Sequence, residues 1–247
     1  MMTTVTNDLT IGDLRAAIAA GWADFRACPA FGLFFAAIYI AAGLLLYYAL
    51  FVRAEAAWLV PAAAGFPLLA PFAAVGLYEV SRRREAGLPM KWGPVLGALR
   101  GHDDGQILTM GVIVFVAFAF WIGIAHGIFA IFMAQSGVGS QSLALFGTAT
   151  GIAMLVVGGA AGALMALALF SITVISLPML VDREVDFITA IIASLATIRS
   201  NRFVLLAWAI IVAVSLFAAI VPLFLGLLVV LPVLGHATWH LYRRSVH

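Results

Sequence analysis

Histidines are the residues of this chain that could best hold a metal or a haem iron. His236 and His240 stand four positions apart, so a helix would place both imidazoles on one face. No acidic residue accompanies them in the sequence, and counting back from Arg243 puts them near the cytoplasmic headgroups, where histidine needs no metal. His126 lies about 20 Å from His236 in depth, at about 1.5 Å per residue, too far to share one haem. We therefore predict no cofactor and no metal, and keep these three histidines as the candidate ligands.

The acidic residues indicate neither a catalytic site nor an ion-coupling site. All 11 lie in predicted loops or at predicted helix ends, whereas ionisable groups that carry ions or protons lie inside the membrane. Glu79 comes closest to membrane depth, and Arg82 and Arg83 lie one turn away, which favours a helix-end ion pair. His-Asp-Asp at 102–104 fits a helix cap better than a metal site. Neither a nucleophile elbow nor a nucleotide loop occurs, so the chain is not predicted to be an enzyme.

Basic clusters and apolar runs define the elements that would position these residues. The chain has 247 residues, of which 65% are hydrophobic and 10% charged, whereas a soluble domain is about 25% charged. Two apolar runs separate each basic cluster from the next, which by the positive-inside rule predicts six membrane-spanning helices with both termini in the cytoplasm. Every Lys and Arg except Arg53 belongs to one of four clusters: Arg15 and Arg26; Arg82, Arg83, Arg84, Lys91 and Arg100; Arg183, Arg199 and Arg202; Arg243 and Arg244.

The predicted fold is all-α, with six transmembrane helices arranged as three hairpins, each preceded by an amphipathic helix on the cytoplasmic side. The first amphipathic helix, at 11–27, carries Asp13, Arg15 and Asp24 opposite its apolar face, and Thr10 with Asp13 would cap it. Asp186 would cap the third, at 187–200. The spans are predicted at about 31–52, 58–80, 107–132, 151–180, 203–219 and 223–242. The apolar faces are Ile11, Leu14, Ile18, Trp22 and Phe25 in the first amphipathic helix, and Ile188, Ile191, Ile192, Leu195 and Ile198 in the third.

These elements form one membrane domain, 1–247, built from three repeat-like units at about 10–84, 91–184 and 186–247. Pro71 precedes Arg82 by 11 residues, and Pro232 precedes Arg243 by the same 11 residues. The middle unit departs from this pattern, because Pro178 stands only five residues before Arg183.

Small residues and basic residues predict two kinds of contact. Gly158 and Gly162, extended by Gly151, form a stripe on the fourth span, and Gly123 and Gly127 flank His126 on the third. Such stripes let another helix approach closely, in the same chain or in another subunit. Basic residues at the span ends predict contact with anionic lipid headgroups; they are Arg82, Arg83, Arg84, Arg243 and Arg244.

Three motifs resemble those of a family of predicted bacterial integral membrane proteins of uncharacterised function, domain of unknown function 2189. The motifs are Ala-Ala-Gly-Trp-Ala-Asp-Phe at 19–25, Pro71-Phe72 with Gly-Leu-Tyr-Glu-Val-Ser-Arg-Arg at 76–83, and Trp92. The resemblance extends over nearly the full chain and implies no catalytic residues. Some relatives are labelled as oxidase subunits, but the few histidines argue against an oxidase catalytic core.

The function favoured by the sequence is that of a non-catalytic protein of the bacterial inner (plasma) membrane. It would be an accessory or assembly partner of a larger, respiratory-type complex, in contact with lipids and other membrane subunits but not with nucleic acid. The alternative is a transporter or channel for a small neutral or lipophilic solute, with a path along the pseudo-threefold axis. A lipid-modifying or haem-binding enzyme resting on His236, His240 and Tyr242 ranks last.

Overall fold

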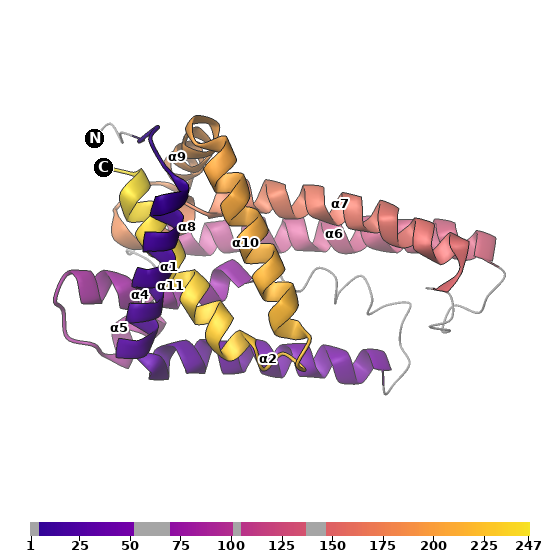
Figure 1. Ribbon diagram of the computed structural model, residues 1–247, viewed down its shortest axis with the longest axis horizontal. Coiled ribbons are helices and arrows are strands. Elements are labelled where there is room, and N and C mark those ends of the chain that lie inside the picture. The colour runs from indigo at the N-terminus through magenta and orange to yellow at the C-terminus, as the bar shows by residue number, and fades with distance from the viewer. Residues whose placement is uncertain (1–4, 52–69, 101–104, 137–146) are drawn as a thin grey trace. The chain divides into compact units, whose positions relative to one another are not determined.

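The computed structural model describes residues 5–51, 70–100, 105–136 and 147–247. Within these ranges the chain is helical, apart from turns and one antiparallel bridge between Val5 and Val246. Unit 1 comprises Met1–Ile40, Ala70–Val112 and Phe170–His247, and unit 2 comprises Ala41–Leu69 and Ile113–Leu169. Figure 1 labels the elements, which in chain order are α1 (Ile11–Ala27), α2 (Pro29–Phe51), α4 (Ala70–Glu85), α5 (Trp92–Gly97), the 3₁₀ turn η2 (Ala98–Arg100), α6 (Gln106–Ser136), α7 (Ala149–Thr173), α8 (Ser176–Asp182), α9 (Phe187–Ser200), α10 (Arg202–Ile220) and α11 (Leu227–Ser245).

Four stretches of helix among the described residues are long and apolar enough to cross a membrane. They match the predicted first, third, fourth and fifth spans, so the prediction of an all-α, multi-pass membrane protein is confirmed. The predicted second span lies mostly outside the described residues, as does the predicted cap at 102–104. Helix α11 covers most of the predicted sixth span but is not among the four, because two histidines and two arginines make its second half polar. Six spans in three hairpins stay a prediction. The four stretches are Pro29–Ala49, Gln106–Ala134, Ala149–Asp182 and Arg202–Ile220.

The predicted repeat-like units each contain a first element followed by two helical stretches: α1, α2 and α4; α5 with η2, α6 and α7 with α8; α9, α10 and α11. In the first and third of these repeat-like units, a single residue links the first helix to the second. These residues, Cys28 and Asn201, have nearly the same backbone angles, φ −132° and ψ 54° against φ −128° and ψ 36°. The N–H of each donates to a carbonyl four residues earlier, at 3.0 Å in both cases. Duplication of the sequence itself stays a prediction.

Within unit 1, the first element of each predicted repeat-like unit packs against the last helix of another such unit. Helix α5 packs on α4, α9 packs on α8, and α1 packs on α11, where the two ends of the chain meet. Figure 1 shows α1 lying along α11. The helices α4, α8 and α11 also pack against one another. Helix α1 therefore joins the first repeat to the third.

The buried side chains of α9 are small, and on α1 the small Ala17 and Gly21 are buried beside the bulky Leu14 and Phe25. A Cβ atom on Gly21 would lie 2.6 Å from the Val233 carbonyl oxygen and from the Ala237 nitrogen, so α1 crosses α11 at its glycine. The bulky Trp22 stays 44% exposed and Ile192 on α9 61% exposed, which leaves these side chains available to lipid. The buried residues are Leu14, Ala17, Gly21, Asp24 and Phe25 on α1, and Ala190, Ala193, Ser194 and Thr197 on α9.

This packing corrects the predicted polar face of α1, because Asp24, predicted to lie opposite the apolar residues, is only 6% exposed. The predicted caps are confirmed. Thr10 and Asp13 form a reciprocal capping box at the start of α1. Asp186 caps α9 through a bond from the Thr189 N–H.

Unit 2 contains parts of α2, α6 and α7. Phe129 on α6 and Met154 on α7 form a small buried cluster. Gly162 faces the Trp121 ring, where an added Cβ would lie 3.0 Å away. Large apolar side chains elsewhere on α6 and α7 are exposed, among them Phe115, Val116, Phe120, Val156 and Leu164. A surface of this kind suits lipid or helices of another subunit.

Candidate functional site

The strongest concentration of buried polar groups lies in unit 1, where α1, α4 and α11 meet. We call it the Asp24 junction, and its members are Asp24 on α1, Ser81 and Arg84 on α4, and His236 and His240 on α11. Ser81 and His236 are completely buried. Because burying a polar group is unfavourable unless it is hydrogen-bonded, the pairing of each atom decides what the junction can do.

Asp24 is the centre of the junction and accepts hydrogen bonds from three side chains. Its Oδ2 accepts from Ser81 Oγ at 2.6 Å and from His240 Nε2 at 2.9 Å. Its Oδ1 accepts from the Arg84 guanidinium. Burial raises the pKa of Asp24, but the hydrogen bonds from His240 and Ser81 outweigh it, so the pKa lies below the ordinary value. Asp24 is therefore a carboxylate, paired with Arg84.

The proton count at Ser81 determines the tautomer of His236. The Ser81 hydroxyl has one proton, and it donates that proton to Asp24. Ser81 Oγ also lies 2.7 Å from His236 Nδ1, so in this second contact Nδ1 must be the donor. The neutral ring then carries its proton on Nδ1 and a lone pair on Nε2. That Nε2 is buried and has no hydrogen-bond partner among the described residues.

The order of groups differs from that of a nucleophilic triad. In a triad the hydroxyl bonds the imidazole and the imidazole bonds the carboxylate. Here the Ser81 hydroxyl donates a hydrogen bond directly to Asp24 and accepts a hydrogen bond from His236. Ser81 has no exposed surface. His236 is therefore not placed to accept the Ser81 proton, as the imidazole of a triad would be.

The structure brings together His236 and His240, two of the three predicted candidate ligands. It corrects the view that they have no acidic partner, because Asp24 reaches them from the other end of the chain. His240 donates from its Nε2 to Asp24, and His236 Nε2 is a buried ring nitrogen with no hydrogen-bond partner among the described residues. No group of three or more His, Cys, Asp or Glu suited to hold a metal occurs in the described part of the chain.

The third candidate, His126, belongs to unit 2 and takes no part in the Asp24 junction. Its Nδ1 lies 2.9 Å from the carbonyl oxygen of Ile122, one turn earlier on α6. A contact of this kind satisfies a histidine within its own helix.

The basic residues predicted to face lipid headgroups all make contacts inside the protein. Arg82 forms a bidentate pair with Glu79 at 2.7 and 2.9 Å, and Arg83 reaches the same carboxylate at 3.3 Å, as predicted for a helix-end ion pair. Arg84 pairs with Asp24. These side chains keep partial exposure, and their contact with lipid stays a prediction.

A second polar cluster joins α4, α8 and α11. Asp182, at the end of α8, accepts from Tyr242 Oη at 2.7 Å and from the Arg243 guanidinium at 3.0 Å. Glu85, at the end of α4, accepts from Trp239 Nε1 and from Arg243 Nε, both at 3.0 Å. Arg243 thus bridges the ends of two helices, which is a structural role.

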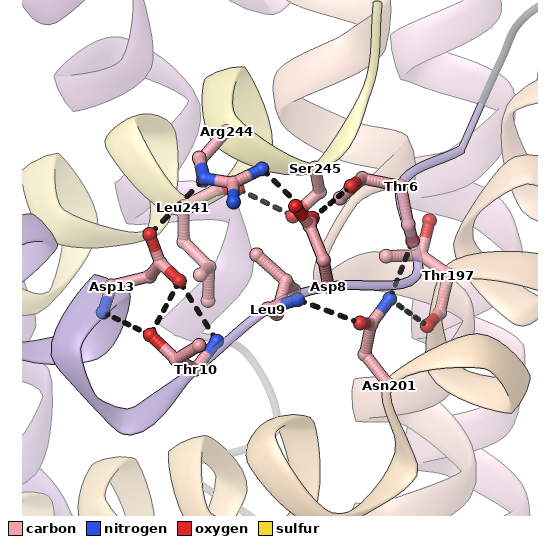
Figure 2. Close-up of polar contacts among 10 residues, drawn as sticks. All are labelled: Thr6, Asp8, Leu9, Thr10, Asp13, Thr197, Asn201, Leu241, Arg244 and Ser245. Atoms are coloured by element: carbon pink, nitrogen blue, oxygen red, sulfur yellow. Dashed lines mark hydrogen bonds and ion pairs between the residues drawn. The ribbon is translucent and has the colours of Figure 1, made fainter.

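A third cluster fastens the N-terminal segment to the C-terminal end of α11 and to Asn201 (Figure 2). Arg244 pairs with Asp8 and Asp13, each at 3.1 Å. Asn201 donates to the Thr6 carbonyl at 2.7 Å and accepts from the Leu9 N–H at 3.1 Å. The Thr6 N–H in turn donates to the Ser245 carbonyl at 3.0 Å. The two ends of the chain therefore lie side by side.

The predicted packing glycines divide into two groups. Gly162 contacts Trp121, and Gly151 is buried. An added Cβ atom would meet no described atom within 4 Å at Gly123, Gly127 or Gly158. The tightest helix contacts lie instead at glycines that the sequence analysis did not single out, Gly21 against the α11 backbone and Gly235 against Leu77.

Asp24 and Ser81 were also missed as site residues, although both lie in the motifs that carry the family resemblance. One signal could have identified Asp24, because it continues the small-residue face of Ala17 and Gly21 at helical spacing. A carboxylate on such a face must be paired when the helix packs.

The family of this chain follows from the comparison with known protein families. A family described as predicted integral membrane protein (DUF2189) matches residues 59–182, half of the chain. The chain belongs to this family. The DUF2189 match includes Ser81 and Arg84 on α4, whereas α1 and α11 lie outside it. No curated protein and no solved structure matches the chain.

Proposed function

We propose that this DUF2189 protein is a non-catalytic subunit that packs against helices of a larger, respiratory-type complex in the bacterial inner membrane, as an accessory or assembly partner. The observation that carries the proposal is a set of open glycines on α6 and on α7 in unit 2. Gly123 and Gly127 stand four residues apart on α6, Gly158 and Gly159 lie on α7, and an added Cβ at any of them would meet no described atom within 4 Å.

Glycine lowers the stability of a helix by up to about 1 kcal/mol relative to alanine, so an open stripe of glycines needs a compensating contact. Lipid tails are as apolar as leucine side chains and gain nothing special from a glycine surface. A second helix does gain, because small residues let two backbones approach and pack. Helices of a partner subunit are therefore the occupant that this surface suits best.

The adjacent chain ends support the proposed topology. The Thr6–Ser245 hydrogen bond and the Val5–Val246 bridge are what we expect if both ends lie on one side of the membrane after an even number of crossings. The arginines at the ends of α4 and α11 favour the cytoplasm as that side by the positive-inside rule.

The test is co-purification after native-level expression and extraction in mild detergent, with mass spectrometry of the native-gel band. We compare wild type with Gly158→Leu combined with Gly159→Leu, and with Val157→Leu. Val157 is exposed and precedes the two glycines on the same helix, so its variant controls for added bulk. The proposal expects partner subunits with wild type and the control, and their loss from the glycine variant. A band that holds this chain alone in every case would contradict it and favour the alternative, a transporter or channel for a small neutral or lipophilic solute.

A further inference from the structure

The Asp24 junction holds ionisable groups that the architecture itself does not require. Asp24 in α1 and Thr197 in α9 are equivalent, since each stands four residues before the single residue that links its helix to the next one. The backbone carbonyl of each accepts the N–H of that linking residue, Cys28 or Asn201, at 3.0 Å. Thr197 is also buried, but its hydroxyl bonds the Ala193 carbonyl of its own helix at 2.7 Å. The corresponding contact of α9 on α8 is therefore made without a carboxylate.

The same comparison applies to His236. Val75, Ser176 and His236 each stand seven positions before an arginine at the C-terminal end of α4, α8 and α11. All three side chains are completely buried. Valine and serine fill this position in two of the repeats, so a histidine with an unpaired lone pair is not needed to pack the third. A role other than packing explains it better.

We propose that the Asp24 junction is a proton-binding site, in which a proton taken up at His236 Nε2 releases the C-terminal half of α1 from α4 and α11. In the closed junction Nε2 has no hydrogen-bond partner among the described residues, and the His236 side chain is completely buried. An imidazolium formed there would have an Nε2–H without an acceptor within hydrogen-bond distance in this described part of the chain, which is unfavourable for a charged group. Opening exposes Nε2 to water, where the proton is stabilised, so acid shifts the equilibrium toward the open form.

The charges around His236 act in both directions, with Asp24 favouring a proton on the ring and His240 and Arg84 opposing it. Asp24 faces the ring through Ser81, but Arg84 and His240 already hold that carboxylate. The other carboxylates of α4 are paired as well, Glu79 with Arg82 and Arg83 and Glu85 with Arg243. Burial of the ring is therefore what chiefly opposes a proton on His236.

The other helices packed on α11 offer no counter-charge. Helix α10 carries charge only at Arg202, its first residue. Helix α8 carries charge only at Asp182, which is bound to Tyr242 and Arg243. Asp24 stays ionised across the histidine range, because its pKa lies below the ordinary aspartate value. The proton is therefore taken up at His236 and not at Asp24.

The second half of α1 is the part free to move. Its start is held by the capping box and by the pairing of Asp13 with Arg244, neither of which contains a histidine. Its second half is fastened by Asp24 and by the contact of Gly21 with α11. Release of residues 21–27 would move Trp22 and the linking residue Cys28, while the two chain ends stay bound to each other.

The test is amide hydrogen exchange of the full-length protein in lipid nanodiscs, corrected for the intrinsic pH dependence of exchange. One proton taken up on opening changes the opening equilibrium by up to about tenfold per pH unit. We expect residues 21–27 of wild type to lose protection by roughly that factor per unit below the ordinary histidine pKa of about 6.5. His236→Gln should abolish this acid response, and His240→Gln should retain it.

His247→Gln serves as the control, because it removes a titrating histidine beyond the end of α11. If His236→Gln does not fold, nitrogen NMR of wild type with labelled histidine rings tests the proposal instead. The proposal requires that His236 Nε2 carries a lone pair at neutral pH. It also requires that Nε2 becomes protonated over the same pH range in which α1 is released. An equal acid response in wild type and His236→Gln would overturn the proposal, as would a response lost in His240→Gln alone. So would a His236 ring that carries its proton on Nε2 at neutral pH.

Discussion

Replacing Asp24 by alanine removes the acceptor shared by three side chains of the junction. Ser81 is completely buried, and its hydroxyl would lose its acceptor at a loss of about 1–3 kcal/mol. The side chains of Arg84 and His240 are 33% and 26% exposed, so water can replace part of what they lose. We assign each of these two about 0.5–1 kcal/mol, near the value for surface pairs. The expected fall in the free energy of unfolding is therefore about 3 kcal/mol.

Asp24→Asn is the matched variant that keeps the shape of the side chain. Its amide oxygen can still accept from Ser81, but its uncharged group no longer pairs with Arg84. We expect it to be less destabilising than alanine, at about 1–2 kcal/mol, because the fully buried hydrogen bond is the one that survives.

The assay is reversible unfolding in mixed micelles with increasing SDS, followed by circular dichroism. Asp8→Ala is the control, because it also removes a carboxylate paired with an arginine, but one whose side chain is 65% exposed. We expect no measurable change from that variant. The reasoning fails if Asp24→Ala destabilises the protein no more than Asp8→Ala does, since burial of the shared acceptor would then be irrelevant.

Further variants test the close packing, the terminal clasp and the electrostatics. Gly21→Ala places a Cβ 2.6 Å from backbone atoms of α11 and should destabilise by about 1–3 kcal/mol in the same assay, whereas Gly93→Ala, which meets no described atom within 4 Å, should not. Asn201→Ala removes an acceptor for the Leu9 N–H and a donor to Thr6, at about 1 kcal/mol for each bond, and should speed hydrogen exchange in residues 5–10. The folded-state pKa of Asp24 lies below the ordinary 3.8, so its contribution to stability is fully present above that pH and is lost only as pH falls through the folded value. Because the proposed acid release depends on His236, the pH profile of His236→Gln should be compared with that of His236→Gln combined with Asp24→Asn. The difference should be constant between neutral pH and about pH 5, and a difference that shrinks across that range would contradict the assignment.

Local signals allowed much of the fold to be predicted from the sequence. Apolar runs long enough to cross a membrane identified four helices. Capping residues located the starts of α1 and α9, since Thr10, Asp13 and Asp186 act within three residues of their targets. The pairing of Glu79 with Arg82 and Arg83 was equally local.

Long-range packing could not be predicted in the same way. Nothing near Asp24 in the sequence shows that α1 packs on α11, more than 200 residues away. The bulky side chains of α1 suggested the important face, but a membrane protein can turn bulky apolar residues to lipid and small ones to its own helices. Trp22 follows that rule on the exposed side, and Gly21 follows it at the contact with α11.

Photo-cross-linking in intact cells tests the proposed subunit role most directly. A photoreactive amino acid at exposed Leu155 lies one turn before Gly158 and Gly159, on the glycine side of α7, and one at exposed Val157 points to the opposite side. The account predicts a discrete adduct with another membrane protein from Leu155 and none from Val157. Adducts with lipid alone from both positions would contradict the claim that this surface receives a partner helix.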